Sequence, residues 1–123
     1  MSLETDVQRQ LTTAFINTQP VVLVLTPWEL VKTPAGGKKF QAQTNRTPQT
    51  MRLIESGAYG GPLPRPVVTL DGVERYVEFE LLGEWDAVVA NHDTFTYGGS
   101  DWEVVQVAFF NGWEQRALVA RHG

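Results

Sequence analysis

The chain has 123 residues, no cysteine and a formal net charge of −4. This length suits one domain with a sizeable core, and the lack of cysteine excludes disulfides and thiolate metal sites and fits assembly in a reducing cytoplasm. The negative charge argues against a general nucleic-acid-binding protein, and no apolar run or N-terminal leader pattern indicates a membrane span or a signal peptide.

The first predicted element is an amphipathic helix over residues 3–17. Apolar side chains recur there at helical spacing, at Leu3, Val7, Leu11, Ala14 and Phe15. Ser2 suits the N-cap position, and Pro20 closes the segment.

The sequence of residues 21–123 predicts short strands joined by turns. Runs of β-branched and aromatic residues indicate strands at 21–26, 28–33, 49–55, 67–70, 73–82, 87–89, 94–97, 102–110 and 113–121. Two segments rich in Pro and Gly, 34–48 and 56–66, are predicted as long loops, which in a compact domain are usually functional. About seven strands with one terminal helix predict a mainly β fold. We expect a small antiparallel barrel, with residues 1–123 as one domain.

The dipeptide Asn111-Gly112 predicts a hairpin between the last two strands, because it supplies both positive-φ residues of a type I′ turn. A two-residue loop would set these pairs: Phe110 with Trp113, Ala108 with Gln115, Gln106 with Ala117, Val104 with Val119, and Trp102 with Arg121. Both faces of that hairpin would carry large apolar groups. A small domain has one core, so we expect the second face to contact another protein.

Basic residues are concentrated in residues 30–54, which contain no Asp or Glu. Half of the ten basic residues of the chain lie there: Lys32, Lys38, Lys39, Arg46 and Arg52. The run Gly36–Lys39 lacks the glycine, the hydroxyl residue and the following helix of a phosphate-binding loop. We interpret it as a flexible basic loop.

No arrangement of residues predicts catalysis, a cofactor or a metal. The alternating carboxylates of Glu78 and Glu80 are typical of the solvated face of a strand. His92 is expected in a turn and His122 is expected to be exposed, and neither has a second metal ligand at a recognisable spacing.

Each of the four tryptophans has an acidic neighbour, as Trp102 has Asp101 and Glu103. Such neighbours would repel phosphate, so core or subunit-interface packing is favoured over a stacking surface for single-stranded nucleic acid.

Several runs of residues together resemble a known family. They are Leu82–Ala87, His92–Phe95, Trp102–Val104, Asn111–Glu114 and Arg116–Gly123, with weaker similarity at Thr33–Gly37 and Thr47–Ile54. Their order and spacing resemble the head-to-tail stopper, or head-completion, proteins of long-tailed bacteriophages, especially phages of actinobacteria. His92 stands where many relatives have glycine.

The resemblance implies a structural, non-enzymatic virion protein, made in the host cytoplasm and located at the head–tail interface. Several copies would form a ring below the portal and adaptor, close the DNA-filled head and provide the platform for the tail terminator and tail tube. Six copies are expected, with twelve as the alternative. A loop from each subunit would project into the channel and retain the double-stranded DNA until ejection. No membrane partner is implied.

We expect the channel loop to be 34–48, with Lys38 and Lys39 near its tip and Arg46 on its return, facing DNA by non-specific electrostatics. A solvated loop whose lysines serve solubility is the plain alternative, and 56–66 is the competing loop. Subunit or partner interfaces are expected at Trp102, Phe109, Phe110, Trp113, Leu118, Tyr59, Pro62 and Pro64. Two alternative functions are a tail terminator or other connector ring protein, and a small nucleic-acid-binding β-barrel.

Overall fold

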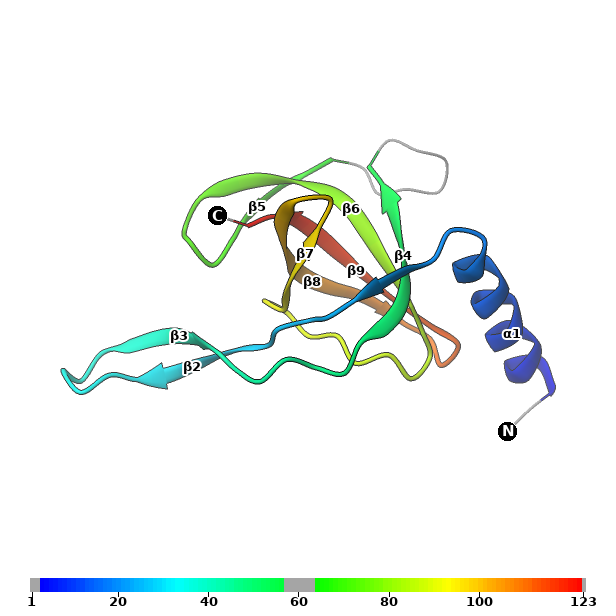
Figure 1. Cartoon of the computed structure of the whole chain (residues 1–123), viewed down its shortest axis with the longest axis horizontal. Helices are drawn as coiled ribbons and strands as arrows, with labels where there is room; N and C mark the ends of the chain where they lie inside the picture. The colour runs from blue at the N-terminus through cyan, green and yellow to red at the C-terminus, as the bar shows by residue number, and fades with distance from the viewer. Residues whose placement is uncertain (1–2, 57–63, 123) are drawn as a thin grey trace.

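The computed structural model describes residues 3–56 and 64–122, and for residues 108–110 it describes the backbone alone. One helix lies on one side of a strongly curved antiparallel sheet, and a two-stranded hairpin projects from the opposite side (Figure 1). The helix is α1 (Leu3–Asn17), as predicted. The strands are β1 (Val21–Leu23), β2 (Trp28–Lys32), β3 (Lys38–Ala42), β4 (Gln49–Glu55), β5 (Pro66–Val68), β6 (Glu74–Glu84), β7 (Thr94–Tyr97), β8 (Ser100–Phe110) and β9 (Glu114–Arg121).

The main sheet is a nearly closed antiparallel barrel. Its strand order is β1-β4-β6-β9-β8-β7, with β5 paired to β6. The two ends of that order meet at Thr26 and Thr94, whose backbone amides each donate to the other's carbonyl at 2.8 and 2.9 Å. Closure leaves few strand edges open to pairing with other chains. The predicted fold class, a mainly β barrel of about seven strands with one helix, is confirmed.

The interior of the barrel is apolar because inward and outward side chains alternate along the strands. Its main cluster comprises Leu23, Leu25, Met51, Leu81, Phe95, Trp102, Val104, Ala117 and Val119. None of the helices in the described part of the chain is long and apolar enough to cross a bilayer.

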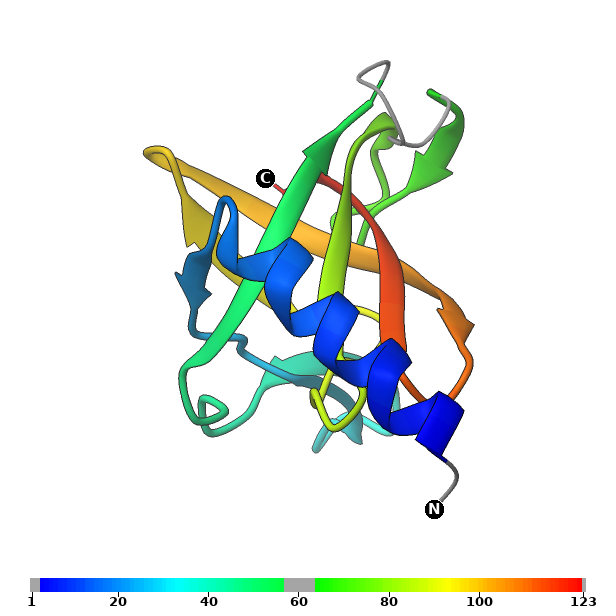
Figure 2. The same ribbon diagram turned by 90° about the vertical axis from the view of Figure 1, so that its right-hand side faces the viewer.

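Helix α1 lies across the outer face of the sheet, over β4 and β6 (Figure 2). Thr12 and Ile16 are the buried helix residues, and Ile16 packs with Ile54 and Leu82. Polar contacts add to this small apolar contact between the helix and the sheet. The Arg9 side chain donates to the Gly112 carbonyl at 2.9 Å and lies 3.8 Å from the Trp85 ring centroid.

The apolar stripe that predicted the helix is therefore largely left outside the buried contact with the sheet, and its residues Leu11 and Phe15 lie at the edge of that contact. Leu3 is 80% exposed and Leu11 58% exposed, and Val7 and Phe15 are also exposed. The spacing predicted the helix correctly, but the face that packs on the sheet is a different one.

Two predictions about residues between the strands are wrong. Residues 38–42 lie within the predicted loop 34–48 but form β3, which pairs with β2. Residues 87–89 do not form a strand. The Gln49 side chain takes the place of a partner strand there, since it donates to the Val88 carbonyl at 3.0 Å and accepts from the Val88 amide at 2.8 Å. Within the predicted loop 56–66, residues 57–63 lie outside the described residues.

The terminal hairpin exists, but its turn and register differ from the prediction. Asn111 has no positive φ; its side-chain oxygen accepts from the Trp113 and Glu114 amides, while Gly112 alone takes φ 92°. Two bulges in β8 each insert one residue, so Phe110 lies opposite Gln115 instead of Trp113.

The far end of the hairpin is as predicted. Val104 pairs with Val119 and Trp102 with Arg121, whose guanidinium carbon lies 5.2 Å from the Trp102 ring centroid.

Candidate functional site: a projecting basic hairpin

Strands β2 and β3 form a hairpin, and the five residues Thr33 to Gly37 form the turn that connects them. The Thr33 amide donates to the Gly37 carbonyl at 2.8 Å, and the Gly36 amide donates to the Thr33 carbonyl at 3.0 Å. Pro34 follows Thr33, where its fixed φ suits the first central position of the turn, and Gly36 takes φ 88°. The segment 34–48, which was predicted as a loop, thus contains most of the hairpin turn and the whole of strand β3.

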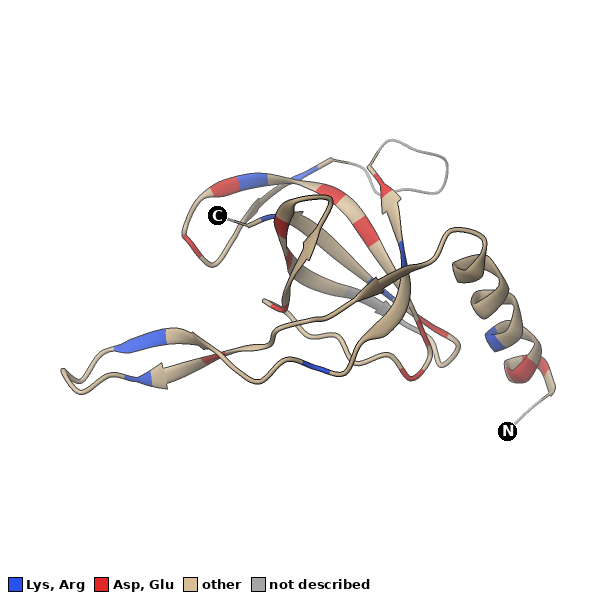
Figure 3. Ribbon diagram, viewed as in Figure 1, with Lys and Arg blue, Asp and Glu red and all other residues tan. Residues whose placement is uncertain are grey.

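Lysines surround this tip. Lys32 lies opposite Lys38 in the ladder, and Lys39 lies opposite Val31. All five residues of β3 are exposed. Figure 3 shows these basic positions at the far end of the hairpin, and the hairpin also carries one acidic residue, Glu29, near the start of β2. The hairpin therefore presents a small, solvated, positively charged end.

The three lysines differ from the arginines in having no partner. No hydrogen bond or ion pair to the side chains of Lys32, Lys38 and Lys39 occurs within the described residues. Every arginine is engaged: Arg9 with Gly112, Arg46 with Asp93, Arg52 with Phe15, Arg65 with Gln106, Arg75 with Asp71, Arg116 with Glu80, and Arg121 with Glu78. The basic side chains that remain available to bind an external anion therefore lie on the hairpin.

Arg46 has a different place from the one predicted for it. Its Nε and Nη2 donate to the two carboxylate oxygens of Asp93 at 2.9 and 3.1 Å, and Asp93 is fully buried. Such a two-point pair holds both groups firmly. We therefore assign Arg46 to the root of the hairpin and not to its tip.

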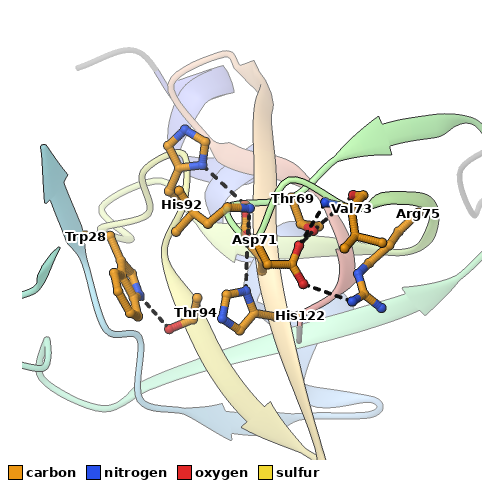
Figure 4. A network of polar contacts seen from close by, with 10 residues as sticks. Trp28, Thr69, Asp71, Val73, Arg75, His92, Thr94 and His122 are labelled. Atoms are coloured by element: carbon orange, nitrogen blue, oxygen red, sulfur yellow. Dashed lines mark hydrogen bonds and ion pairs between the residues drawn. The ribbon is translucent and has the colours of Figure 1, made fainter. Parts of the chain in front are cut away.

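A network of polar and aromatic contacts joins the hairpin root to the barrel. Trp28, on β2, donates from Nε1 to the Thr94 hydroxyl at 2.9 Å. Phe40, on β3, packs against the His92 ring, with 5.2 Å between centroids. His92 and His122 approach one central group from opposite sides (Figure 4).

That central group is the carboxylate of Glu103, which is fully buried. The His92 Nδ1 lies 3.3 Å from Oε2, and the His122 Nδ1 lies 2.9 Å from Oε1. The Leu70 amide donates to the same carboxylate at 2.9 and 3.2 Å. His122 was expected to be exposed, but its side chain is only 23% exposed because it lies against this carboxylate.

The residues predicted to form interfaces are in varied environments. Trp102 and Leu118 lie in the core of the protein, 5% and 9% exposed, which corrects their assignment because they offer almost no surface. Pro64 is exposed. Trp113 is half-buried and lines a shallow groove of about 280 Å³ beside Leu11 and Phe15 of the helix. Tyr59, Pro62 and the side chains of Phe109 and Phe110 lie outside the described residues.

A cavity of about 600 Å³ lies between residues 45–50 and 84–88. Its charged residues are Arg46, Glu84 and Asp86. Arg46 is bound to Asp93, Glu84 accepts from the Thr13 hydroxyl, and Asp86 is exposed. Among the described residues no group of three His, Asp or Glu is arranged to hold a metal ion. The cavity thus offers no free positive charge, whereas the exposed strand β3 of the hairpin carries Lys38 and Lys39.

No protein-family model matches the chain, and no curated protein matches it in sequence. A virion chain shares its fold. This solved structure is described as "Virion of native gene transfer agent (GTA) particle" and is 18% identical over an alignment covering 82% of the present chain and 91% of that chain, with a TM-score of 0.51. The GTA chain and this protein thus share an architecture along most of their lengths.

Proposed function

We propose that this protein is a structural, non-enzymatic virion component of the head–tail connector, of the stopper type. The observation that carries the proposal is the hairpin, which extends away from the barrel and holds the three unpartnered lysines. The resemblance in the sequence and the fold shared with a GTA virion chain support the same class of protein.

Exposed apolar surface supports a role in assembly. The helix stripe, Leu3, Val7, Leu11 and Phe15, faces solvent and continues into the groove beside Trp113. A contiguous apolar patch of this kind usually marks a contact with another protein. We propose that it is covered by a neighbouring subunit or by the adaptor in the assembled particle.

We propose a ring, because a head-to-tail contact whose rotation divides a full turn closes on itself. We propose six copies, with twelve as the alternative. With three lysines on each of six hairpins, 3 × 6, about 18 positive charges would surround one axis. Such a collar attracts the phosphate backbone without reading sequence, which suits retention of any genome end.

The test is a phage stock that lacks the gene. We expect DNA-filled heads and separate tails that fail to join, and joining on addition of the purified protein. Mature tailed particles without the protein would contradict the proposal. If the protein is instead found on free tails and absent from tailless heads, the tail-terminator alternative gains support.

A further inference from the structure

We propose that Glu103 is a positioning residue that fixes the direction in which the β2–β3 hairpin leaves the barrel. It would act through the short segment His92–Asp93–Thr94, here called the socket, and through His122. The importance of this direction for the particle rests on the proposed function, but the positioning itself is a property of the isolated protein.

Each residue of the socket contacts one side chain from the hairpin strands, here called the arms, or from the segment that returns from the hairpin to the barrel. His92 receives the Phe40 ring at 5.2 Å. Asp93 receives the Arg46 guanidinium at 2.9 and 3.1 Å. Thr94 accepts a hydrogen bond from Trp28 at 2.9 Å. Three consecutive residues thus contact the incoming arm, β2, the outgoing arm, β3, and the return segment between β3 and β4.

The backbone of the socket is held in an unusual conformation. His92 has φ 73°, a left-handed value, and among the described residues no other non-glycine residue has a positive φ. A side chain at such a position persists only where its surroundings hold it. The His92 amide donates to the Val104 carbonyl at 2.6 Å, and its ring meets Glu103 on one side and Phe40 on the other.

Glu103 is suited to hold both histidines. An ionised carboxylate accepts hydrogen bonds and donates none, so with an ionised Glu103 each nearby Nδ1 would be the donor. This requirement fixes the tautomer and the orientation of both rings. His92 then presents its ring to Phe40 of β3, and His122 presents its ring to Trp28 of β2, with 6.2 Å between centroids.

Backbone bonds also hold the root of the hairpin, but they leave β3 without a backbone partner in the main sheet. The Gln43 amide donates to the Pro27 carbonyl and joins the two arms, while the Arg46 amide donates to the carbonyl of Leu25, a core residue of the barrel, both at 2.8 Å. The backbone pair between Thr26 and Thr94 holds only the incoming arm. Among the described strands, however, β3 pairs with β2 and not with the main sheet, so the contact of Phe40 with His92 is a side-chain tie between β3 and the barrel.

The experiment measures the direction of the hairpin in the full chain by electron-spin distances. The sequence has no cysteine, so Ala35→Cys at the hairpin tip and Glu74→Cys on β6 give two unique spin-label sites. We expect a narrow distance distribution with Glu103 intact. With Glu103→Gln, which replaces an acceptor oxygen by an NH₂ group, we expect it to broaden roughly twofold. Glu78→Gln, on an exposed strand position, is the matched control and should leave the distribution narrow.

Two further variants decide the case if Glu103→Gln does not fold. His92→Gly relieves the backbone strain but removes the ring, and Phe40→Ser removes the ring that rests on it. Broadening in both supports the socket. An unchanged distribution in folded Glu103→Gln, or in both of the other variants, overturns the proposal. DNA leakage from heads is scored separately: a loosened hairpin with no leakage would contradict the channel role and leave the positioning role intact.

Discussion

At the scale of single residues, Asp71 shows how the fold changes the chemistry of a turn. Its carboxylate accepts hydrogen bonds from the Thr69 hydroxyl, from Arg75 at 3.0 Å and from the Val73 amide at 3.2 Å. The Thr69 bond contributes most, and together these lower the pKa of Asp71 from 3.8 to about 2. The charged form is therefore favoured by folding.

The sign of the pH effect follows from this shift. Because the unfolded chain binds the proton more readily, Asp71 stabilises the fold above its unfolded pKa of 3.8, and this contribution is lost as the pH falls towards 2. We expect Asp71→Asn to lower the free energy of unfolding near neutral pH and to have a much smaller effect near pH 2. Urea unfolding of both proteins across this range is the measurement. A difference that stays constant with pH would contradict the assignment.

Gly112 is the second residue with a clear expected effect. It has φ 92°, and a Cβ built there meets nothing within 4 Å, so backbone strain is the only obstacle to a side chain. We expect Gly112→Val to reduce the free energy of unfolding by about 1–3 kcal/mol. Gly37→Ala is the control, because Gly37 has no positive φ and its Cβ would make an ordinary 3.5 Å contact. Equal stability of both variants would show that the Gly112 conformation is not required.

At the scale of elements, helix α1 has one face packed on the sheet and an exposed stripe that we propose for assembly. Ile16 is 2% exposed, so Ile16→Ala should destabilise the protein by roughly 2–5 kcal/mol. Leu11 is 58% exposed, so Leu11→Ser should change stability by only about 0.5 kcal/mol. We expect Leu11→Ser to weaken self-association or adaptor binding in analytical ultracentrifugation. Assembly equal to wild type would show that the helix stripe is not a contact surface.

The elements also show which features the sequence could predict. Helical spacing located α1, and β-branched runs located most strands, because these signals depend on near neighbours. The bulges in β8 depend on pairing with β9 and are not visible in β8 itself. The same limit applies at 87–89, where a distant side chain, that of Gln49, satisfies the backbone.

Among the site residues, the basic tip of the hairpin was predicted and its root was not. Lys38 and Lys39 stand out because composition shows a local excess of positive charge. Asp101 and Glu103 look equivalent on either side of Trp102, yet Asp101 is exposed and Glu103 is fully buried. The partners that bury Glu103, His92 and His122, come from other segments. Only the folded chain brings them together.

At the scale of the whole molecule, net charge and local charge act in opposite directions. Three free lysines on one hairpin give a monomer few phosphate contacts, and the net charge of −4 opposes binding. We expect the isolated monomer to bind random duplex DNA more weakly than micromolar at physiological salt, by fluorescence anisotropy. Sub-micromolar binding by the monomer would favour the nucleic-acid-binding alternative.

Assembly would change this balance by bringing the hairpins to one axis. We expect the double variant Lys38→Gln and Lys39→Gln to fold and assemble normally, because both side chains are exposed and unpartnered. More of its filled heads should lose DNA before tails attach, since the collar would lose two of the three lysines on each hairpin. Nuclease-accessible DNA released from purified heads is the measurement.

The matched control for this variant is Asn17→Asp with Gln19→Glu. It lowers the net charge by the same two units, from −4 to −6, at exposed positions far from the hairpin. Leakage in the hairpin variant alone would tie DNA retention to the position of the charge. Leakage in both would implicate net charge. If retention, ejection and infectivity all match wild type in the hairpin variant, Lys38 and Lys39 have no role in holding the genome, and the hairpin would serve contacts between proteins.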